Sequence, residues 1–491
     1  MAKSSSSKKS KKSSSSKSRK EKALSTVIIT ESNMDKYIPL SELDIEPNVW
    51  EMPNRKVFSN WFYSNYSQYK VGAKLPKSKG NLQLFRIQRL VKNFFQTGNP
   101  NRGILVFHGL GLGKSCGAIS ISQANMDRDV IFLSKASLES NFIYEIKKCG
   151  ASYMRMINYW VFSKCKTDEE KQLATQLRIP DSLIKENGGC FFIDFSKNSS
   201  NYDNLDETHK SKLTKQIETT ILGRFKFLHL DDTRLLKKIK EGDFDDKLVI
   251  VDEVHNLINS MTNETVTGDF FYKFMMNSKN TKYVFLSGTP LINRVLESSR
   301  LFNILRGYIP TLIYKILTTP NTDINWSEIK SVLSANEYID QVIIDKTRKT
   351  IKITKNPDGY INTKLKTNKS SISSTLSKSN KSNKSRKSSN IWNGIKYEPD
   401  DSITFIDFRK QIDTLINILG KEQLFKIKFA FENNTALPEE EVDFERLFYN
   451  PELNKLKNQA IIKKRIGGLT SYYNKVFDKS EFPELKFKKI V

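Results

Sequence analysis

With 491 residues, 38% of them hydrophobic, the chain is long enough for several domains with sizeable cores, and its formal net charge is +26. No apolar run approaches the roughly 18 residues of a membrane span, and no apolar segment marks the N-terminus as a secretory signal. The four cysteines form no CxxC pair and the four histidines show no zinc-binding spacing, so we expect a reducing compartment and no structural metal.

Two segments hold much of the positive charge. Residues 1–22 contain nine Lys/Arg and one Glu, and residues 363–390 contain eight Lys/Arg and no acid. Lys/Ser-rich stretches of this kind are typical of disorder, so we predict a disordered tail and a disordered linker. The rest of the chain keeps a positive excess, which favours a polyanion such as DNA or RNA as partner, because neutralising phosphates releases counterions.

The first half of the chain predicts an α/β domain. Residues 23–81 are irregular but rich in aromatics, and we expect them to pack as an extension on the domain that follows. Apolar residues at helical spacing predict a helix within residues 82–95. Four short apolar runs predict buried strands, at residues 103–107, 129–133, 248–251 and 283–286. Strands that alternate with helical stretches in this way indicate parallel βαβ units.

The pattern changes after residue 300. Residues 338–354 alternate in hydrophobicity on both sides of a polar break, which predicts a β-hairpin. Residues 405–419 and 439–473 are expected to be mainly helical. We therefore expect a tail, an extension, an α/β domain, an accessory segment with the hairpin, a linker and a helical accessory region, at residues 1–22, 23–81, 82–300, 301–362, 363–390 and 391–491.

A phosphate-binding loop is the first motif. The strand at residues 103–107 runs into HGLGLGKS, residues 108–115. Glycines let the backbone amides face a phosphate, and the following helix presents its positive N-terminal end to the same anion. Lys114 would contact the β- and γ-phosphates of ATP, and the Ser115 hydroxyl would ligate Mg²⁺. The nucleotide-binding candidates are His108, Gly109, Leu110, Gly111, Leu112, Gly113, Lys114 and Ser115.

His108 stands where the strict pattern GxxxxGK[ST] has its first glycine, a position that superfamily 2 proteins commonly relax. A chance glycine-rich turn is the alternative to a phosphate loop. The strand before the loop and the helix after it favour phosphate binding.

An acidic box, LVIVDEVH, is the second motif. Its four apolar residues place Asp252 and Glu253 at the carboxyl edge of a sheet, where α/β proteins bind ligands. Asp252 would hold Mg²⁺ through water, and Glu253 would orient or deprotonate the attacking water. A surface Asp-Glu pair without a role is the alternative, but two adjacent carboxylates after a buried strand favour hydrolysis. His255 is expected to couple the nucleotide site to the rest of the domain.

The remaining candidates rest on weaker signals. In FLSGTP, residues 285–290, the hydroxyls of Ser287 and Thr289 could bond the acidic box and sense the γ-phosphate; an ordinary turn is the alternative. Gln88 is a candidate for reading the adenine edge, with a plain exposed helical glutamine as its alternative. The loop after the second predicted strand is a candidate nucleic-acid contact, through Ser134, Lys135 and Ser137.

The motifs together resemble a known family. In this order, HGLGLGKS, SKASLESNFIYEI, KLVIVDEVHNL, FLSGTPLINR, LFNILRGYIP and RIGGLTSYYNKVF are similar to segments of the helicase-like NTPases of nucleocytoplasmic large DNA viruses. That superfamily 2 family includes the poxvirus early transcription factor small subunit and nucleoside triphosphate phosphohydrolase I. The resemblance runs from about residue 85 to the C-terminus, except for the linker. It implies a RecA-like P-loop domain.

The resemblance also implies a function. It indicates a nucleic-acid-stimulated ATPase of helicase or translocase type that uses ATP and Mg²⁺ and serves viral transcription. The implied partners are DNA or RNA and subunits of a viral RNA polymerase or transcription factor, with no membrane. The implied locations are the virion and the host cytoplasm during infection. The carried-over residues are Lys114, Ser115, Asp252, Glu253 and His255 for the ATPase site and Ser287 and Thr289 for coupling.

One family motif is missing from the sequence. Members continue into a second RecA-like domain with the motif QxxGRxxR, and this string does not occur here. Its arginines neutralise the γ-phosphate in the transition state, and such a finger contributes on the order of 10³–10⁵ in rate. We therefore expect either a second chain that carries the missing domain or, as the alternative function, a half-motor or scaffold that binds ATP and nucleic acid but hydrolyses ATP poorly.

Overall fold

The computed structural model describes residues 35–37, 43–70, 72–75, 84–109, 111–291, 293–319, 323–364 and 392–474. The predicted tail at residues 1–22, most of the predicted linker and Leu110 lie outside these residues. No helix in the described part of the chain is long and apolar enough to cross a membrane.

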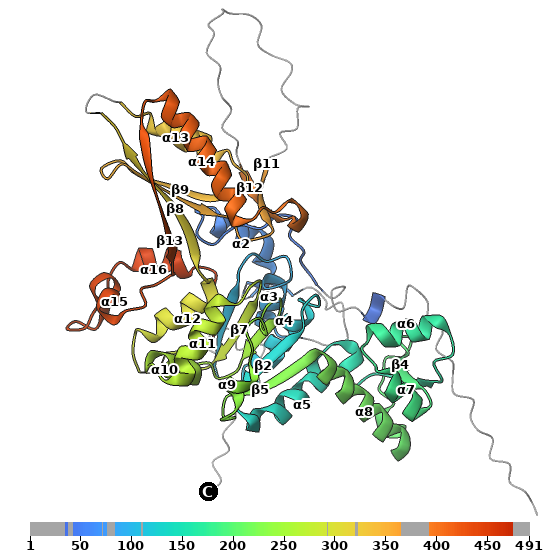
Figure 1. Ribbon diagram of the computed structural model, residues 1–491. Helices are drawn as coiled ribbons and strands as arrows, with labels where there is room; N and C mark the ends of the chain where they lie inside the picture. The colour runs from blue at the N-terminus through green and yellow to red at the C-terminus, as the bar shows by residue number, and fades with distance from the viewer. Residues whose placement is uncertain are drawn as a thin grey trace, which may run out of the picture.

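A six-stranded parallel sheet forms the centre of the fold (Figure 1). Its order is β16 (Thr470–Tyr473), β1 (Gly103–His108), β7 (Lys282–Ser287), β6 (Leu248–Val251), β2 (Val130–Ser134) and β5 (Phe225–His229). Every neighbouring pair is parallel. The four strands that the sequence predicted are β1, β2, β6 and β7, so the expected RecA-like parallel sheet is confirmed.

The sheet is buried between two helical layers, which is why its strands are apolar runs rather than alternating ones. One face packs against α3 (Arg86–Phe94), α4 (Lys114–Gln123), α5 (Glu139–Cys149) and α8 (Glu207–Arg224). The other face packs against α10 (His255–Thr262), α11 (Val266–Asn277) and α12 (Glu297–Arg306), which lie together in Figure 1. Consecutive residues of β6 alternate between the two cores, and all four are 0% exposed.

A small subdomain is inserted between α5 and α8. It contains β3 (Trp160–Ser163), α6 (Asp168–Gln176), α7 (Asp181–Asn187) and β4 (Cys190–Ile193), and β3 pairs with β4 in antiparallel fashion. The short helix α9 (Leu235–Lys238) follows β5 in the main domain.

The cysteines are paired as Cys116–Cys149 and Cys165–Cys190. From the sequence we expected unpaired cysteines, so the two pairs differ from that expectation. Neither pair could be predicted from the sequence, because the two cysteines of each pair are 33 and 25 residues apart and meet only through tertiary packing.

The accessory region has its own four-stranded antiparallel sheet, in the order β13 (Lys426–Asn434), β8 (Ile309–Leu317), β10 (Thr350–Lys355) and β9 (Ile339–Asp345). The predicted hairpin is confirmed as β9 and β10, and the predicted helix at residues 405–419 is confirmed as α14 (Phe405–Glu422). Helices α13 (Trp326–Ser334) and α14 share one core with the sheet. The expected accessory segments 301–362 and 391–491 are therefore joined, because β8 comes from the first and β13 from the second.

The region expected to be mainly helical at residues 439–473 is only partly so. It holds α15 (Glu441–Phe448) and α16 (Gln459–Ile466), but also the short strands β14 (Tyr449–Asn450) and β15 (Lys455–Leu456). It ends in β16, which returns to the main sheet beside β1. The sequence could not reveal this strand, because its four residues (TSYY) are not an apolar run and its partner strand lies more than 360 positions away.

Aromatic residues near the N-terminus pack on the main domain, as the composition of this segment led us to expect. In α2 (Phe58–Tyr66), Phe62 and Tyr66 meet Phe94 of α3 with ring centroids 5.6 and 5.8 Å apart. Trp50 bridges to Ile395 in β12 (Trp392–Tyr397), which pairs with β11 (Tyr360–Lys364). The N-terminal segment thus contacts both the main domain and the accessory region.

Candidate active site

The candidate residues gather at one edge of the main sheet. Because β1, β2, β6 and β7 are parallel, their carboxyl ends meet at the same edge. The strands end there at His108, Ser134, Val251 and Ser287. The structure therefore brings the phosphate loop, the acidic box and the SGTP segment together, as parallel topology predicts.

The phosphate loop has a backbone that requires glycine. Gly111 and Gly113 have φ values of +71° and +70°, in the left-handed region that residues with a Cβ avoid. Lys114 is the first residue of α4, so the amides of the first helical turn face the loop. Leu112 differs from the other loop candidates because it is 1% exposed and packs with Ile87 and Tyr473. Its side chain anchors the loop, and nucleotide binding at this residue stays a prediction.

Gln88 braces the phosphate loop from α3. Its side-chain amide donates to the carbonyl of Gly113 at 2.9 Å, and its carbonyl accepts from the amide of Phe85 at 2.9 Å. Gln88 is 3% exposed, so the alternative of a plain exposed helical glutamine is wrong. Both ends of the Gln88 side-chain amide therefore already form hydrogen bonds within the protein. Contact of Gln88 with the adenine edge of ATP stays a proposal.

His108 is buried at the start of the loop. Burial, reinforced by the Lys114 charge, lowers the pKa of His108 to about 4, so the ring is neutral at physiological pH. Its Nε2 lies 3.0 Å from the hydroxyl of Ser471 in β16. The next residue, Gly109, donates its amide to the carbonyl of Tyr473 at 3.1 Å. Sequence reasoning assigned no role to Ser471 or Tyr473, although both stand in a segment that carried the family resemblance.

Asp252 and Glu253 follow β6 directly. Asp252 accepts a hydrogen bond from the amide of Glu253 at 2.9 Å. Burial raises the pKa of Asp252, and the charge of Glu253 acts in the same direction, whereas Lys114 and His255 oppose it. Glu253 has a φ of +45°, which is rare for a residue with a side chain and costs conformational energy. A buried carboxylate with excess negative charge beside it is a site that a divalent cation would stabilise.

The acidic box is connected to the SGTP segment. His255 Nδ1 lies 3.1 Å from the hydroxyl of Ser287 and 3.3 Å from a carboxylate oxygen of Glu253. The amide of Thr289 donates to the Ser287 hydroxyl at 3.0 Å. The two segments therefore form a continuous chain of polar contacts from Glu253 to Thr289.

The candidate nucleic-acid contact divides into buried and exposed parts. Ser134 is 1% exposed and donates its hydroxyl to the carbonyl of Lys135, so its side chain does not face solvent. Lys135 and Ser137 are exposed. The amide of Ala136, between them, donates to Asp231 at 3.0 Å. Sequence reasoning missed Asp231, because it follows β5, a strand with no recognised motif.

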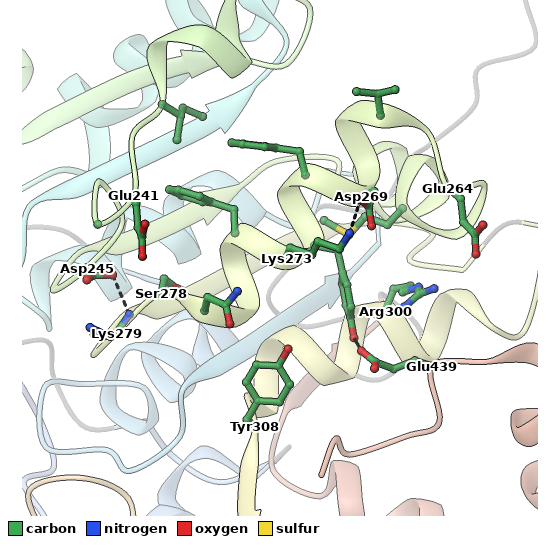
Figure 2. A pocket seen from close by; sticks show the side chains of 18 of the residues that line it. Glu241, Asp245, Glu264, Asp269, Lys273, Ser278, Lys279, Arg300, Tyr308 and Glu439 are labelled. Carbon is green, nitrogen blue, oxygen red and sulfur yellow. Dashed lines mark hydrogen bonds and ion pairs between the residues drawn. The ribbon is translucent and has the colours of Figure 1, made fainter. Parts of the chain in front are cut away.

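Two of the cavities in the described part of the chain lie outside this polar chain. One, of about 250 Å³, is lined mainly by aromatic and aliphatic side chains of α2, α3 and β16, including Tyr66, Ile87 and Tyr473. The other, of about 1240 Å³, lies along α11 and reaches Glu439 (Figure 2). Acidic side chains outnumber basic ones along the larger cavity, so its charge does not suit a nucleotide phosphate.

The chain has viral relatives, although no family model matches it. A protein of Acanthamoeba polyphaga mimivirus, named as a candidate ATP-dependent RNA helicase, is 28% identical over 266 residues, which are 52% of this chain and 21% of that protein. The termination factor NPH-I homolog of African swine fever virus is 27% identical over 220 residues, 43% of this chain and 23% of that protein. A candidate helicase of Invertebrate iridescent virus 3 is 22% identical over 262 residues, 49% of this chain and 22% of that protein.

These relatives confirm the resemblance to helicase-like NTPases of large DNA viruses. The chain spans between a fifth and a quarter of their length. Among solved structures, the SWI2/SNF2 ATPase core of Sulfolobus solfataricus in complex with dsDNA aligns with 41% of this chain and 31% of that chain, at 16% identity and a TM-score of 0.22. That structural likeness is too low to support an argument.

Proposed function

We propose that this chain is a nucleic-acid-stimulated ATPase of the superfamily 2 helicase type. One observation carries the proposal. The phosphate loop, the paired carboxylates and the His255–Ser287 contact lie at one edge of a single parallel sheet. A binding protein needs only the loop, whereas adjacent carboxylates and a polar path leading away from them suit hydrolysis coupled to movement.

Each residue at this edge has a distinct role in the proposal. Lys114 and the first amides of α4 bind the β- and γ-phosphates. Ser115 and Asp252 supply the oxygen ligands that Mg²⁺ prefers. When bound, this ion neutralises charge that develops on the phosphates. Glu253 orients the attacking water and accepts its proton, and its partly exposed carboxylate is reachable by water. His255, Ser287 and Thr289 transmit the state of the site.

The small aromatic cavity is our candidate for the base of ATP. It borders α3, whose Gln88 holds the phosphate loop, and β16, whose Tyr473 carbonyl binds Gly109. Tyrosine and aliphatic side chains offer flat apolar contact to an adenine ring without reading its edge.

A half-motor is the second candidate function. Within the described residues, no arginine forms an ion pair or a hydrogen bond with Asp252, Glu253 or His255. Phosphoryl transfer is accelerated by an arginine that another domain or chain can supply. We therefore propose a partner unit that completes the site. Slow turnover by the isolated chain would favour this candidate.

The biological setting is also a proposal. The relatives are viral proteins, and one is named as a termination factor homolog. We propose that the chain acts during infection, in the virion or the host cytoplasm, with DNA or RNA and with subunits of a viral transcription apparatus. Movement along duplex without strand separation is compatible with this proposal.

Binding of Mg²⁺-ATP tests the role of the loop. Lys114→Ala is expected to weaken ATP affinity at least about 100-fold, because a lysine–phosphate ion pair is lost in a partly desolvated site. Fluorescent ATP titration measures this, with Lys237→Ala as a control that removes an exposed lysine of α9 in the same domain. Tight ATP binding by the Lys114 variant would refute the assignment of the loop.

A further inference from the structure

The accessory sheet buries one face against helices, and its other face is exposed at Lys315, Lys352, Lys426 and Lys428, although Thr311 and Ile313 on that face are buried. Leu312, Tyr314 and Ile316 of β8 and Ile351 and Ile353 of β10 are at most 2% exposed and share a core with α13 and α14. Both helices lie against the same side of this sheet in Figure 1. Because side chains alternate between the faces of a strand, the intervening residues lie on the opposite face.

Four lysines stand on that opposite face, and we name it the lysine face: Lys315, Lys352, Lys426 and Lys428. Lys315 is directly opposite Lys428 in the register of β8 and β13. Lys352 pairs with Glu432 at 3.5 Å. Within the described part of the chain, no ion pair joins Lys315, Lys426 or Lys428 to a carboxylate, and all three are exposed.

This arrangement is unfavourable for the sheet alone. Like charges directly opposite each other on neighbouring strands destabilise the pair. Lysines on an edge strand often protect it from pairing with another chain, which would explain Lys426 and Lys428 on β13. That explanation fails for Lys315 and Lys352, because β8 and β10 are the two inner strands. A ligand with several negative charges would remove the repulsion.

We infer that the lysine face binds the phosphate backbone of duplex nucleic acid, as a contact surface additional to the one at residues 134–137. The inference rests on the proposed function for the presence of a nucleic acid. Lysine is a mobile point charge that suits phosphates without reading bases.

The aromatic side chains of the sheet explain the choice of a duplex. Tyr314 and Phe429 belong to the core shared with the helices, and Phe431 packs on Phe405. The lysine face thus offers charge but, within the described residues, no ring on which an unpaired base could stack. Single-strand binding normally relies on such rings. A duplex needs none, because its bases are already stacked and its phosphates face outward.

The test compares two triple variants of the 491-residue chain. Lys315, Lys426 and Lys428 are changed to Gln in one, and Lys330, Lys410 and Lys421 on α13 and α14 are changed to Gln in the other, with the same change in charge. Fluorescence anisotropy measures affinity for duplex and single-stranded DNA and RNA without nucleotide, over a range of salt. In the lysine-face variant, the magnitude of the negative slope of log K against log salt should fall by roughly 2 to 3. Its affinity for duplex should fall on the order of tenfold.

The result has clear alternatives. The corresponding Lys→Arg triple variant should retain duplex affinity, which separates loss of charge from misfolding. Equal slopes for the two Gln variants, while the native chain binds duplex, would overturn the lysine face and leave the proposed function standing. A native chain that binds no nucleic acid would overturn both. Loss of single-strand affinity alone, or a change in oligomeric state without a change in affinity, would overturn the duplex assignment.

Discussion

Asp252 and Glu253 are neighbours in sequence but differ in their surroundings. Asp252 is held by the amide of Glu253 and has a raised pKa because of burial. Glu253 is forced into a left-handed backbone conformation, with its carboxylate beside His255. Backbone strain of this kind persists where the surrounding structure imposes it, and it is frequent at functional sites. These different surroundings support our proposal that the two carboxylates have different tasks.

Replacing Asp252 should separate stability from activity. A carboxyl whose pKa is raised in the folded state favours its protonated form there, so its ionised form destabilises the fold at neutral pH. Asp252→Asn should therefore raise Tm at pH 7 without Mg²⁺. The gain should disappear as the pH falls below the ordinary carboxyl range, where Asp252 is protonated in both states. Differential scanning calorimetry over a range of pH measures this.

The same variant should lose at least about 100-fold in Mg²⁺-dependent turnover, because the carboxylate proposed to hold the ion is lost. Asp358→Asn is a suitable control, since Asp358 is exposed and far from the strand ends in sequence. A lower Tm for Asp252→Asn at pH 7 would show that the carboxylate stabilises the fold, contrary to this account.

At the scale of elements, the phosphate loop depends on α3 as much as on its own glycines. A Cβ on Gly113 would lie 2.3 Å from Nε2 of Gln88, whereas a Cβ on Gly111 would meet no atom of the described residues within 4 Å. The two glycines have nearly the same φ, so they form a matched pair. Comparing the same substitution at Gly111 and Gly113 therefore measures the effect of the contact between Gly113 and Gln88 of α3.

Gly111→Ala should cost about 1–2 kcal/mol of stability, the usual penalty for a left-handed residue with a Cβ. Gly113→Ala should cost more than Gly111→Ala and weaken ATP binding further, because Gln88 must move away from the loop. Urea unfolding and ATP titration measure both effects. Gln88→Ala in the Gly113→Ala background should recover part of the loss. Equal effects of the two glycine variants, with no recovery, would contradict the bracing role of Gln88.

The sequence predicted those parts of the fold and site that depend on local pattern. The strands β1, β2, β6 and β7 are short apolar runs next to recognisable motifs, and parallel topology then places their ends together. Parts that depend on long-range pairing were not predictable. The strand β16 and its contacts with His108 and Gly109 connect segments more than 360 residues apart. The sheet that joins β8 to β13 was missed for the same reason.

At the scale of the whole molecule, the accessory region is inserted in the chain between β7 and β16, two strands of the main sheet. The chain leaves after β7 and α12, builds the four-stranded sheet and returns as β16 beside β1. The amide of Gly109 binds the carbonyl of Tyr473 at the end of this return. A change at the phosphate loop is therefore adjacent to the chain that comes back from the accessory sheet. We propose this connection as the route by which nucleotide binding would affect the lysine face.

The most direct measurement is the steady-state ATPase rate of the chain, with and without single- and double-stranded DNA and RNA, beside Glu253→Gln. We predict turnover that nucleic acid stimulates, and a variant that binds ATP normally but turns over at least about 100-fold more slowly. The matched control is Glu264→Gln, an exposed glutamate of the same domain. Equal turnover by the native chain and the Glu253 variant, or ATP binding with no turnover under any of these conditions, would contradict the proposed ATPase activity of the chain.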